Sequence, residues 1–227
     1  MKCIRIVLLI FVIINQILAE DSSSYQLPVY IVSRTMGSIT IDGHLDDVGW
    51  QSTNVINNFL EVMPGENIPP IVRTEAFVTY DSKNFYVAIK CYDDPKNIRA
   101  QISKRDRIYN DDYAGFYIDT YGDANRAVEF QVNALGIQGD SQTVGSNEDQ
   151  SFDMIFTSAG IITEEGYQVE VAVPFSSLRF PDKEEQTWRF SVFRSLPRND
   201  FMRKMASFRM DRNNPCNLCQ FGYLKGV

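Results

Sequence analysis

Few residues of this chain could carry out covalent chemistry. The sequence holds one histidine, His44, which follows Asp42 and Gly43 in a segment typical of a turn. A Ser-His-Asp triad would have to use this histidine, and its position beside several acids favours a solvated surface residue. The sequence has no paired histidines of the metal-hydrolase kind and no glycine-rich phosphate loop. Nucleophilic and metal-dependent hydrolysis are therefore disfavoured.

Paired carboxylates are the remaining catalytic option. Acid-base cleavage of a glycosidic bond needs two carboxyl groups that flank a cleft. Glu129 and Glu170 lie in segments that alternate like strands, on the side opposite the apolar residues. The same alternation fits two side chains on a solvated face, and we favour this interpretation over a catalytic pair.

Acidic residues gather around two long polar loops, at residues 93–112 and 136–151. Calcium takes about six to eight oxygen ligands, often from such loops. The candidate ligands are Asp111, Asp112, Asp140 and Asp149. Their spacing does not match a helix-loop-helix calcium site, and a solvated acidic surface is the alternative. Calcium is the only cofactor that the sequence suggests.

Aromatic rings beside the first loop could stack on the apolar face of a ligand. These tyrosines are Tyr92, Tyr109, Tyr113 and Tyr121. The two tryptophans, Trp50 and Trp188, lie in patterned segments that favour the protein core instead.

Short strands must position all of these residues. Apolar and polar patterning predicts strands over residues 73–80, 84–91, 113–120, 127–133, 167–173 and 187–194. Most of these segments alternate with a period of two, whereas residues 84–91 are apolar on both faces, as in a central strand. One polar face per strand is typical of an antiparallel sheet. Helical pattern is limited to single turns within residues 45–52 and 174–180. The sequence thus predicts an all-β fold, an antiparallel β-sandwich of the immunoglobulin-like or jelly-roll kind.

The first 19 residues have the order of a secretory signal peptide. A basic segment, Met1–Arg5, precedes an apolar run, Ile6–Ile14, and Ala19 offers a small residue at the expected cleavage site. The run is too short to span a bilayer, which needs about 20 residues. We expect export, a flexible lead-in over residues 20–28 and one domain over residues 29–227.

The net charge limits the kinds of partner, and the cysteines have a different meaning in an exported protein. Removing the leader would lower the net charge from −7 to −9, because the leader holds two basic residues and no acidic ones. Such a charge argues against a nucleic-acid partner, since phosphate binding relies on Lys and Arg. In an exported protein, Cys216 and Cys219 fit either a local disulfide or two idle thiols. Cys91 ends an apolar strand and is predicted to be buried.

Several segments together resemble the family 9 carbohydrate-binding modules. Residues 39–50, ITIDGHLDDVGW from Ile39 on, resemble the family's opening, apolar-x-Ile-Asp-Gly-x-Leu-Asp-x-x-x-Trp. Residues 73–88, 111–119 and 166–178 resemble later family segments, so the resemblance covers nearly all of residues 29–195. It implies a sandwich that binds glycans without cleaving them, beside glycoside hydrolases in carbohydrate breakdown, sometimes with calcium.

Three more segments resemble one branch of that family. Residues 126–140, 188–194 and 219–226 are similar to bacterial surface proteins in which such a domain precedes an outer-membrane β-barrel. This resemblance implies location in the periplasm, in the outer membrane or on the cell surface. It also leads us to expect that the chain is part of a longer product that continues into a barrel.

One departure from the family concerns the glycan site itself. Characterised members clamp a sugar between two loop tryptophans, whereas both tryptophans here fall in structural motifs. The loop of residues 93–112 is the best remaining place, because loops at the end of a rigid sandwich carry function. The candidate glycan-binding residues are Arg105, Asp106, Tyr109 and Tyr113. Arg105 and Asp106 could instead pair with each other and brace the loop.

The first functional hypothesis is thus a non-catalytic module that binds a polysaccharide or an oligosaccharide. A structural or interaction domain of an outer-membrane protein, without a sugar site, is the second hypothesis. A glycosidase that uses Glu129 and Glu170 to hydrolyse O-glycosyl bonds is the third.

Overall fold

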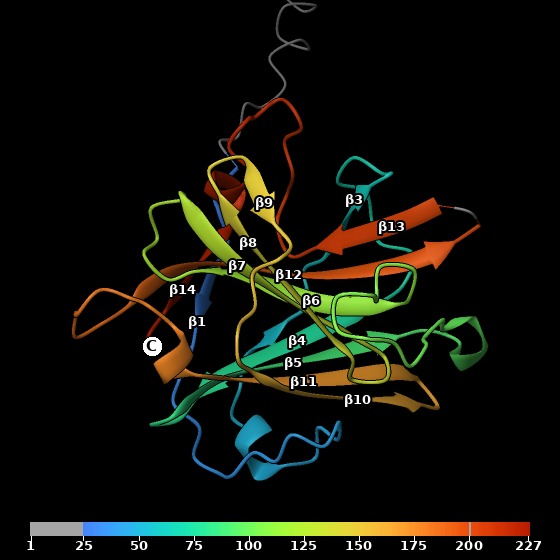
Figure 1. The fold of residues 1–227 in the computed structure, drawn as a ribbon, viewed down its shortest axis with the longest axis horizontal. Coiled ribbons are helices and arrows are strands. Elements are labelled where there is room, and N and C mark those ends of the chain that lie inside the picture. Colours follow the sequence, from blue (N-terminus) through green and yellow to red (C-terminus); the bar gives the residue numbers. More distant parts are fainter. Residues whose placement is uncertain (1–24, 200) are drawn as a thin grey trace, which may run out of the picture.

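The computed structural model describes residues 25–199 and 201–227. Two β-sheets pack face to face as a sandwich (Figure 1), which confirms the predicted fold class. The predicted signal peptide, residues 1–19, lies outside the described residues. Residues 20–24 of the predicted lead-in also lie outside them. None of the helices in the described ranges has the length and apolar character that a membrane crossing requires.

The larger sheet has nine strands. In order of pairing they are β1 (Val29–Ile31), β14 (Gly222–Lys225), β12 (Thr187–Arg198), β6 (Tyr113–Asp119), β7 (Arg126–Asn133), β8 (Gln138–Val144) and β9 (Asn147–Asp149). Beyond this path, β13 (Phe201–Ala206) pairs with β12, and β3 (Leu60–Met63) pairs with β13. The pairings are antiparallel except that of β1 with β14, which is parallel.

The smaller sheet has five antiparallel strands. Their order is β10 (Thr157–Thr163), β11 (Gly166–Pro174), β5 (Asn84–Tyr92), β4 (Thr74–Tyr80) and β2 (Val55–Ile56). The four short 3-10 helices are η1 (Val48–Trp50), η2 (Pro95–Asn97), η3 (Phe175–Ser177) and η4 (Leu218–Gln220). Two of them, η1 and η3, fall within the predicted single turns.

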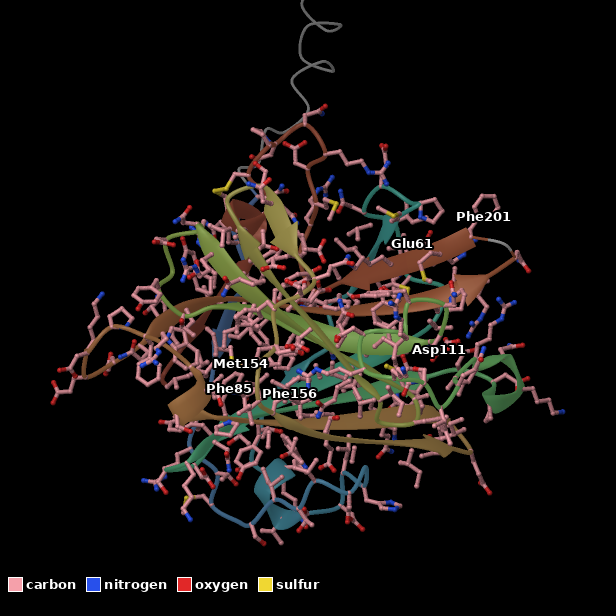
Figure 2. The ribbon with its side chains drawn as sticks, in the orientation of Figure 1. Glu61, Phe85, Asp111, Met154, Phe156 and Phe201 are labelled. Carbon is pink, nitrogen blue, oxygen red and sulfur yellow. A yellow bond between two sulfur atoms is a disulfide. The ribbon has the colours of Figure 1, made fainter. Side chains whose placement is uncertain are left out.

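Each of the six predicted strands is present, with ends that shift by a few residues. The structure also has strands that the prediction lacks: β8 and β9 form a hairpin within residues 136–151, which were predicted to be a polar loop. The strand expected to end at residue 194 continues to Arg198, and β13 follows it as a hairpin partner. Figure 2 shows this hairpin reaching to the periphery of the molecule, where Phe201 lies at its end.

The hydrophobic core lies between the two sheets. Phe85 is at its centre, with its ring in edge-on contact with Phe116, Trp188 and Phe190 at centroid distances of 5.6–6.3 Å. Phe116 stacks on Phe130 at 4.8 Å. Such aromatic pairs add stability beyond their area burial. The core position predicted for Trp188 is confirmed, because this side chain is fully buried in that cluster.

The cysteines resolve the alternatives left by the sequence. Cys216 and Cys219 form a disulfide beside η4, and the predicted burial of Cys91 is confirmed.

Candidate functional site

The outer face of the five-stranded sheet is covered by the segment of residues 39–50. Trp50 is buried there against Tyr86 and Ala172, outside the main core. Its indole Nε1 donates to Glu170 Oε1 at 2.8 Å. The other oxygen, Glu170 Oε2, accepts from the backbone N–H groups of Asp42 and Gly43 at 3.0 and 2.7 Å. Glu170 therefore anchors the covering segment to β11.

The solvated position predicted for Glu170 is wrong, because three donors enclose its carboxylate. Burial raises the pKa of Glu170 above its usual value, and the hydrogen bonds from Gly43, Trp50 and Asp42 oppose that rise. Hydrogen bonds to the ionised form are what make such a buried carboxylate tolerable.

Glu129 lies on the outer face of the other sheet. Its neighbours along β7, Val128 and Phe130, belong to the core between the sheets, so Glu129 points away from that core. Glu170 points outward from β11 in the same way, between Val169 and Val171. The whole sandwich thus separates the two carboxylates. They cannot flank one glycosidic bond, and the glycosidase hypothesis that used this pair is wrong.

The solvated position predicted for Glu129 is wrong as well, because only 5% of the residue is exposed. The register places Tyr117, Glu129 and Ser141 side by side across β6, β7 and β8. Ser141 Oγ donates to Glu129 Oε2 at 3.2 Å, and Lys204 Nζ on β13 donates to Tyr117 Oη at 3.3 Å. We call these four residues the polar row.

Aromatic rings flank the polar row on the same face. Tyr113 and Tyr117 contact Phe193, with ring centroids 6.2 and 5.1 Å apart. Tyr109 lies over Tyr113 at 6.3 Å, and Lys204 Nζ lies 4.7 Å from the centroid of Phe193. Polar groups and ring faces are therefore in reach of one another on this surface.

Of the polar atoms of this face that are buried and have no hydrogen-bond partner among the described residues, a donor and an acceptor lie nearest to Glu129. They are the hydroxyl of Tyr109 and the side-chain carbonyl of Gln131, next to Glu129 on the outward side of β7. Burial raises the pKa of Tyr109 to about 12, and the nearby Glu129 and Asp106 carboxylates add to the rise. The hydroxyl stays a proton donor at neutral pH. A buried donor and a buried acceptor without partners mark a place where a ligand could complete the hydrogen bonding.

The structure divides the four predicted glycan-binding residues into two groups. Tyr109 and Tyr113 belong to the outer face just described. Arg105 and Asp106 turn to the opposite side of the loop, towards the start of β8. Arg105 Nε donates to Asp140 Oδ1 at 2.9 Å, and Asp106 Oδ1 accepts from the Asp140 N–H at 3.1 Å.

Arg105 braces the loop, but its main partner is not the neighbour in sequence. Its closest approach to Asp106 is 4.0 Å, whereas Nη1 donates to Gln138 Oε1 and Nη2 to the carbonyl of Met154, both at 2.7 Å. The guanidinium also lies 5.1 Å from the ring centroid of Phe156. The bracing alternative thus fits Arg105, with Asp140 as the partner.

The predicted exposed tyrosines differ in burial. Tyr113 is 7% exposed, so it supports Tyr109 from below and offers no free ring face. The face of Tyr92 is occupied by Arg73, whose guanidinium carbon lies 3.7 Å from the ring centroid. Tyr121 is 52% exposed and lies just beyond the end of β6, at the opposite end of that strand from Tyr113.

The four predicted calcium ligands do not come together. Asp111 and Asp112 are buried: Asn133 Nδ2 donates to Asp111 at 2.8 Å, and Arg198 donates to both oxygens of Asp112 at 3.0 Å. Asp149 is exposed and accepts from Ser151. Within the described residues, the acidic group that could hold a metal ion contains only one of the four, Asp140.

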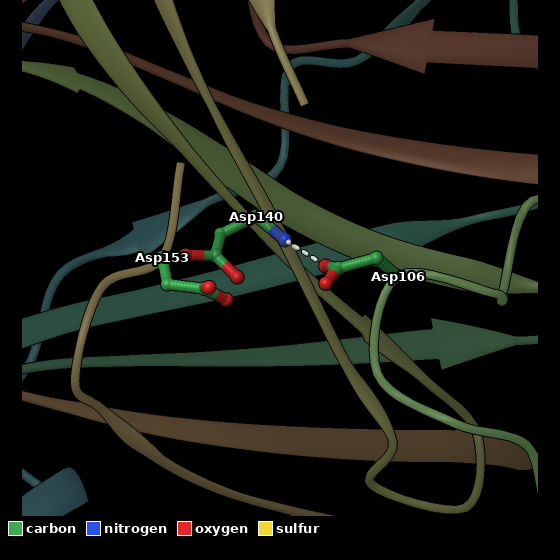
Figure 3. A group of neighbouring side chains, drawn as sticks. All are labelled: Asp106, Asp140 and Asp153. Carbon is green, nitrogen blue, oxygen red and sulfur yellow. Dashed lines mark hydrogen bonds between the residues drawn. The ribbon is translucent and has the colours of Figure 1, made fainter. Parts of the chain in front are cut away.

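A different acidic group forms around Asp140. Carboxylate oxygens of Asp106, Asp140 and Asp153 lie within 4.8 Å of one another (Figure 3). The guanidinium of Arg105 already lies within this group, with Nε 2.9 Å from Asp140 and 3.3 Å from Asp153. A calcium ion would have to displace this guanidinium to reach the carboxylates of Asp140 and Asp153.

Sequence reasoning missed most of the polar row. Alternation in β7 placed Glu129 and Gln131 on the side away from the core, which was the only available signal. Lys204 lies on β13, which the sequence did not reveal as a strand.

The comparisons with known proteins agree with this architecture. The family model for the carbohydrate family 9 binding domain-like proteins matches residues 41–196. The chain belongs to this family. The resemblance seen in the sequence is thereby confirmed, and no curated protein gave a match.

Solved structures share the fold. A family 9 module from Caldicellulosiruptor kristjanssonii, in complex with cellotriose, is 17% identical with a TM-score of 0.61, covering 87% of this chain and 93% of that one. Its complex with glucose is also 17% identical, with a TM-score of 0.60 and coverage of 87% and 95%. A protein from Bacteroides uniformis ATCC 8492 is 13% identical, with a TM-score of 0.66 and coverage of 88% and 99%. At these identities the likeness establishes the fold alone.

Proposed function

We propose that this domain binds carbohydrate without cleaving it, through the outer face of the nine-stranded sheet around Tyr109. The observation that carries the proposal is the pair of buried, unpartnered polar atoms on this face, the Tyr109 hydroxyl and the Gln131 carbonyl, within the described residues. Family membership supports the same function. So does the fold shared with a module whose complexes hold cellotriose and glucose.

The chemistry of the face suits a sugar. A pyranose ring has apolar C–H faces and a rim of hydroxyls that each donate and accept a hydrogen bond. The ring of Tyr109 can meet the C–H face, while its hydroxyl donates to a sugar oxygen. The Gln131 carbonyl and the Glu129 carboxylate accept from sugar hydroxyls, and Lys204 donates. In this proposal one sugar satisfies both unpartnered atoms, which requires the side chains over them to move, because both atoms are buried.

We expect weak binding, because a single tyrosine replaces a clamp of two rings. A stacked ring contributes about 1 kcal/mol beyond area burial, and a dissociation constant on the order of millimolar corresponds to about −4 kcal/mol. Cellotriose should bind more tightly than glucose, since it offers further ring faces.

Titration of the 15N-labelled protein with cellotriose and with glucose tests the proposal. The informative variant is Tyr109→Phe, which keeps the ring and removes the hydroxyl, and Tyr121→Ala is a control on a different surface. We expect Tyr109→Phe to weaken cellotriose binding about threefold to tenfold, with Tyr121→Ala unchanged. Absence of glycan binding at tens of millimolar would favour the structural-domain hypothesis instead.

A separate experiment tests the claim that the domain does not cleave glycans. Incubation of the protein with soluble cellulose oligomers should release no reducing sugar, because Glu129 and Glu170 lie on opposite sides of the sandwich. Release that disappears in Glu129→Gln would contradict this part of the proposal.

We also infer export of the protein and, from the branch resemblance, attachment to an outer-membrane barrel, as part of carbohydrate breakdown. Support for export comes from the order of charged, apolar and small residues in Met1–Ala19. Mass spectrometry of the exported protein should find Glu20 at the N-terminus. The reading frame beyond Val227 is the test of the barrel.

A further inference from the structure

A hollow lies on the side of the sandwich, and Tyr109 is not among its lining residues. It has a volume of about 750 Å3 and opens at the ends of β6 and β7, between the crossing segment of residues 152–155 and η3. We call it the side groove. Its volume is in the range of about 300–1,000 Å3 typical of ligand sites.

The lining of the side groove combines an apolar floor with a polar rim. Val128 and Leu178 in the floor are buried, and both belong to the main core. Tyr121 at the rim is 52% exposed. Asn125 and Gln142 add planar amide groups to the same lining. An exposed ring beside planar polar groups suits a ligand that has both an apolar face and hydroxyls.

Both walls of the side groove are held in place by hydrogen bonds. On one side, Arg105 Nη2 donates to the Met154 carbonyl at 2.7 Å, and the Met154 N–H donates to Asp140 Oδ2 at 2.5 Å. On the other side, the hydroxyl of Thr120 donates to the carbonyl of Arg179. A fixed groove lowers the ordering cost of binding. Arg105 and Asp140 thus position a wall of the groove.

Two arginines that lack carboxylate partners in the described ranges line the side groove. Arg126 and Arg179 both line it, and neither guanidinium has a carboxylate partner or a hydrogen bond within residues 25–199 and 201–227. The lining also holds two acids, neither of which contacts these arginines: Asp123 Oδ1 accepts from the Asn125 N–H at 2.9 Å within the lining, and Asp153 lies 3.3 Å from Arg105 Nε. In a chain of net charge −7, two free cations share one groove.

We propose that the side groove is a second carbohydrate site, selective for oligosaccharides that carry carboxylates, such as chains of uronic acid residues. The ring of Tyr121 and the apolar floor take the C–H face of one sugar. Arg126 and Arg179 bind the carboxylate, because guanidinium groups match carboxylate geometry. Asn125 and Gln142 exchange hydrogen bonds with the hydroxyls. The site is independent of Tyr109 and differs from the proposed function in ligand charge.

The test is calorimetric titration of the full chain with trigalacturonate at about 20 mM salt, with neutral cellotriose as the comparison ligand. We expect saturable binding of trigalacturonate that falls about tenfold in the double variant Arg126→Gln/Arg179→Gln. Tyr121→Ala should weaken it by a similar factor, since one stacked ring is worth about 1 kcal/mol, a fivefold change. Raising the salt to about 0.5 M should weaken it further, because exposed charges are screened.

The variants also separate this proposal from the first one. Tyr109→Phe should leave trigalacturonate binding unchanged, and Arg126→Gln/Arg179→Gln should leave cellotriose binding unchanged. All three side-groove residues are exposed, so their variants should unfold at the wild-type temperature. Two results would overturn the proposal: no trigalacturonate binding, or binding that survives both Arg126→Gln/Arg179→Gln and Tyr121→Ala. Tighter binding of decanoate than of trigalacturonate would also overturn it, by indicating a site for apolar anions.

Discussion

The two outer faces of the sandwich are completed in different ways. On the five-stranded sheet, a covering segment is fixed by three hydrogen bonds to Glu170, and both carboxylate oxygens have partners. On the nine-stranded sheet, Tyr109 and Gln131 keep buried polar atoms without partners in the described part of the chain. The residues that make the family recognisable, those of residues 39–50, therefore seal one face. The proposed glycan face depends on residues outside that motif.

The largest expected effect on stability comes from disrupting the covered outer face of the five-stranded sheet, which we call the sealed face. Trp50 is 5% exposed, and Trp50→Ala would leave a large cavity beside Tyr86. We expect a loss of about 3–5 kcal/mol in the free energy of unfolding, measured by chemical denaturation. A loss below about 1 kcal/mol would contradict the role of this segment as a cover.

A control variant separates packing from hydrogen bonding at the same position. Trp50→Phe keeps an aromatic ring and removes the Nε1 donor to Glu170. We expect a loss of about 1–3 kcal/mol, the cost of a buried acceptor that loses its partner.

The next effect concerns the disulfide loop, which packs at one end of the outer face of the nine-stranded sheet. We call this outer face, around Tyr109, the open face. The disulfide joins Cys216 to Cys219, three residues apart, and between them the buried Leu218 packs with Phe208 and Phe221. A loop this short predicts about 2 kcal/mol of stabilisation from chain entropy. The double variant Cys216→Ser/Cys219→Ser should lose about that amount, and a reductant added to the wild type should reproduce the loss. Wild-type stability in both cases would show that the crosslink constrains nothing.

A substitution on the open face should affect binding more than stability. Gln131→Met keeps the length of the side chain and removes the unpartnered carbonyl. We expect the free energy of unfolding to stay within about 1 kcal/mol of wild type, because no hydrogen bond to that oxygen is lost. Affinity for cellotriose should fall about threefold in the same titration.

Gln220→Met is the matched control for this substitution. Gln220 is buried like Gln131, but its side-chain oxygen accepts from the Asp211 N–H at 2.6 Å, and its amide donates to two carbonyls. We expect this variant to lose about 1–3 kcal/mol. If Gln131→Met and Gln220→Met lose the same free energy of unfolding, then the Gln131 carbonyl is hydrogen-bonded in the folded protein and the prediction is wrong.

The smallest effect is a pH dependence of the sealed face. Burial raises the pKa of Glu170 in the folded state, so the folded protein holds this proton to a higher pH than the unfolded chain does. Its contribution to stability is complete below the unfolded pKa and is lost as the pH rises through the folded pKa. The destabilisation caused by Glu170→Gln should therefore be largest at low pH and shrink as the pH rises. If the difference in the free energy of unfolding between wild type and Glu170→Gln does not change between pH 3 and about 8, the raised pKa is contradicted.

The predictable part of the fold rests on local pattern. Val128, Phe130 and Val132 alternate with polar residues along β7, so the sequence of this strand alone identifies the side that faces the core. The hairpin of β12 and β13 could not be recognised in this way. Its residues include Pro197, Arg203 and Lys204, and β13 also pairs with β3, which is far away in the sequence.

The candidate site was harder to predict, because its charges are paired over long separations. Arg105 lies next to Asp106 in the sequence, yet its close partner is Asp140, 35 residues away. Asp112 suggested a calcium ligand, but it is neutralised by Arg198, 86 residues away. A sequence gives the charge of each side chain and leaves open which of them the fold brings together.

The parallel pairing of β1 with β14 has a mechanical consequence. The two strands run side by side in the same direction, joined by bonds such as Tyr223 N–H to the Pro28 carbonyl and Val32 N–H to the Lys225 carbonyl. If tension pulls Tyr25 and Val227 apart, the two strands are drawn past each other along their length. The hydrogen bonds between them are then loaded in shear and share the force, instead of opening one after another. A domain tethered at both ends would resist stretching at this seam.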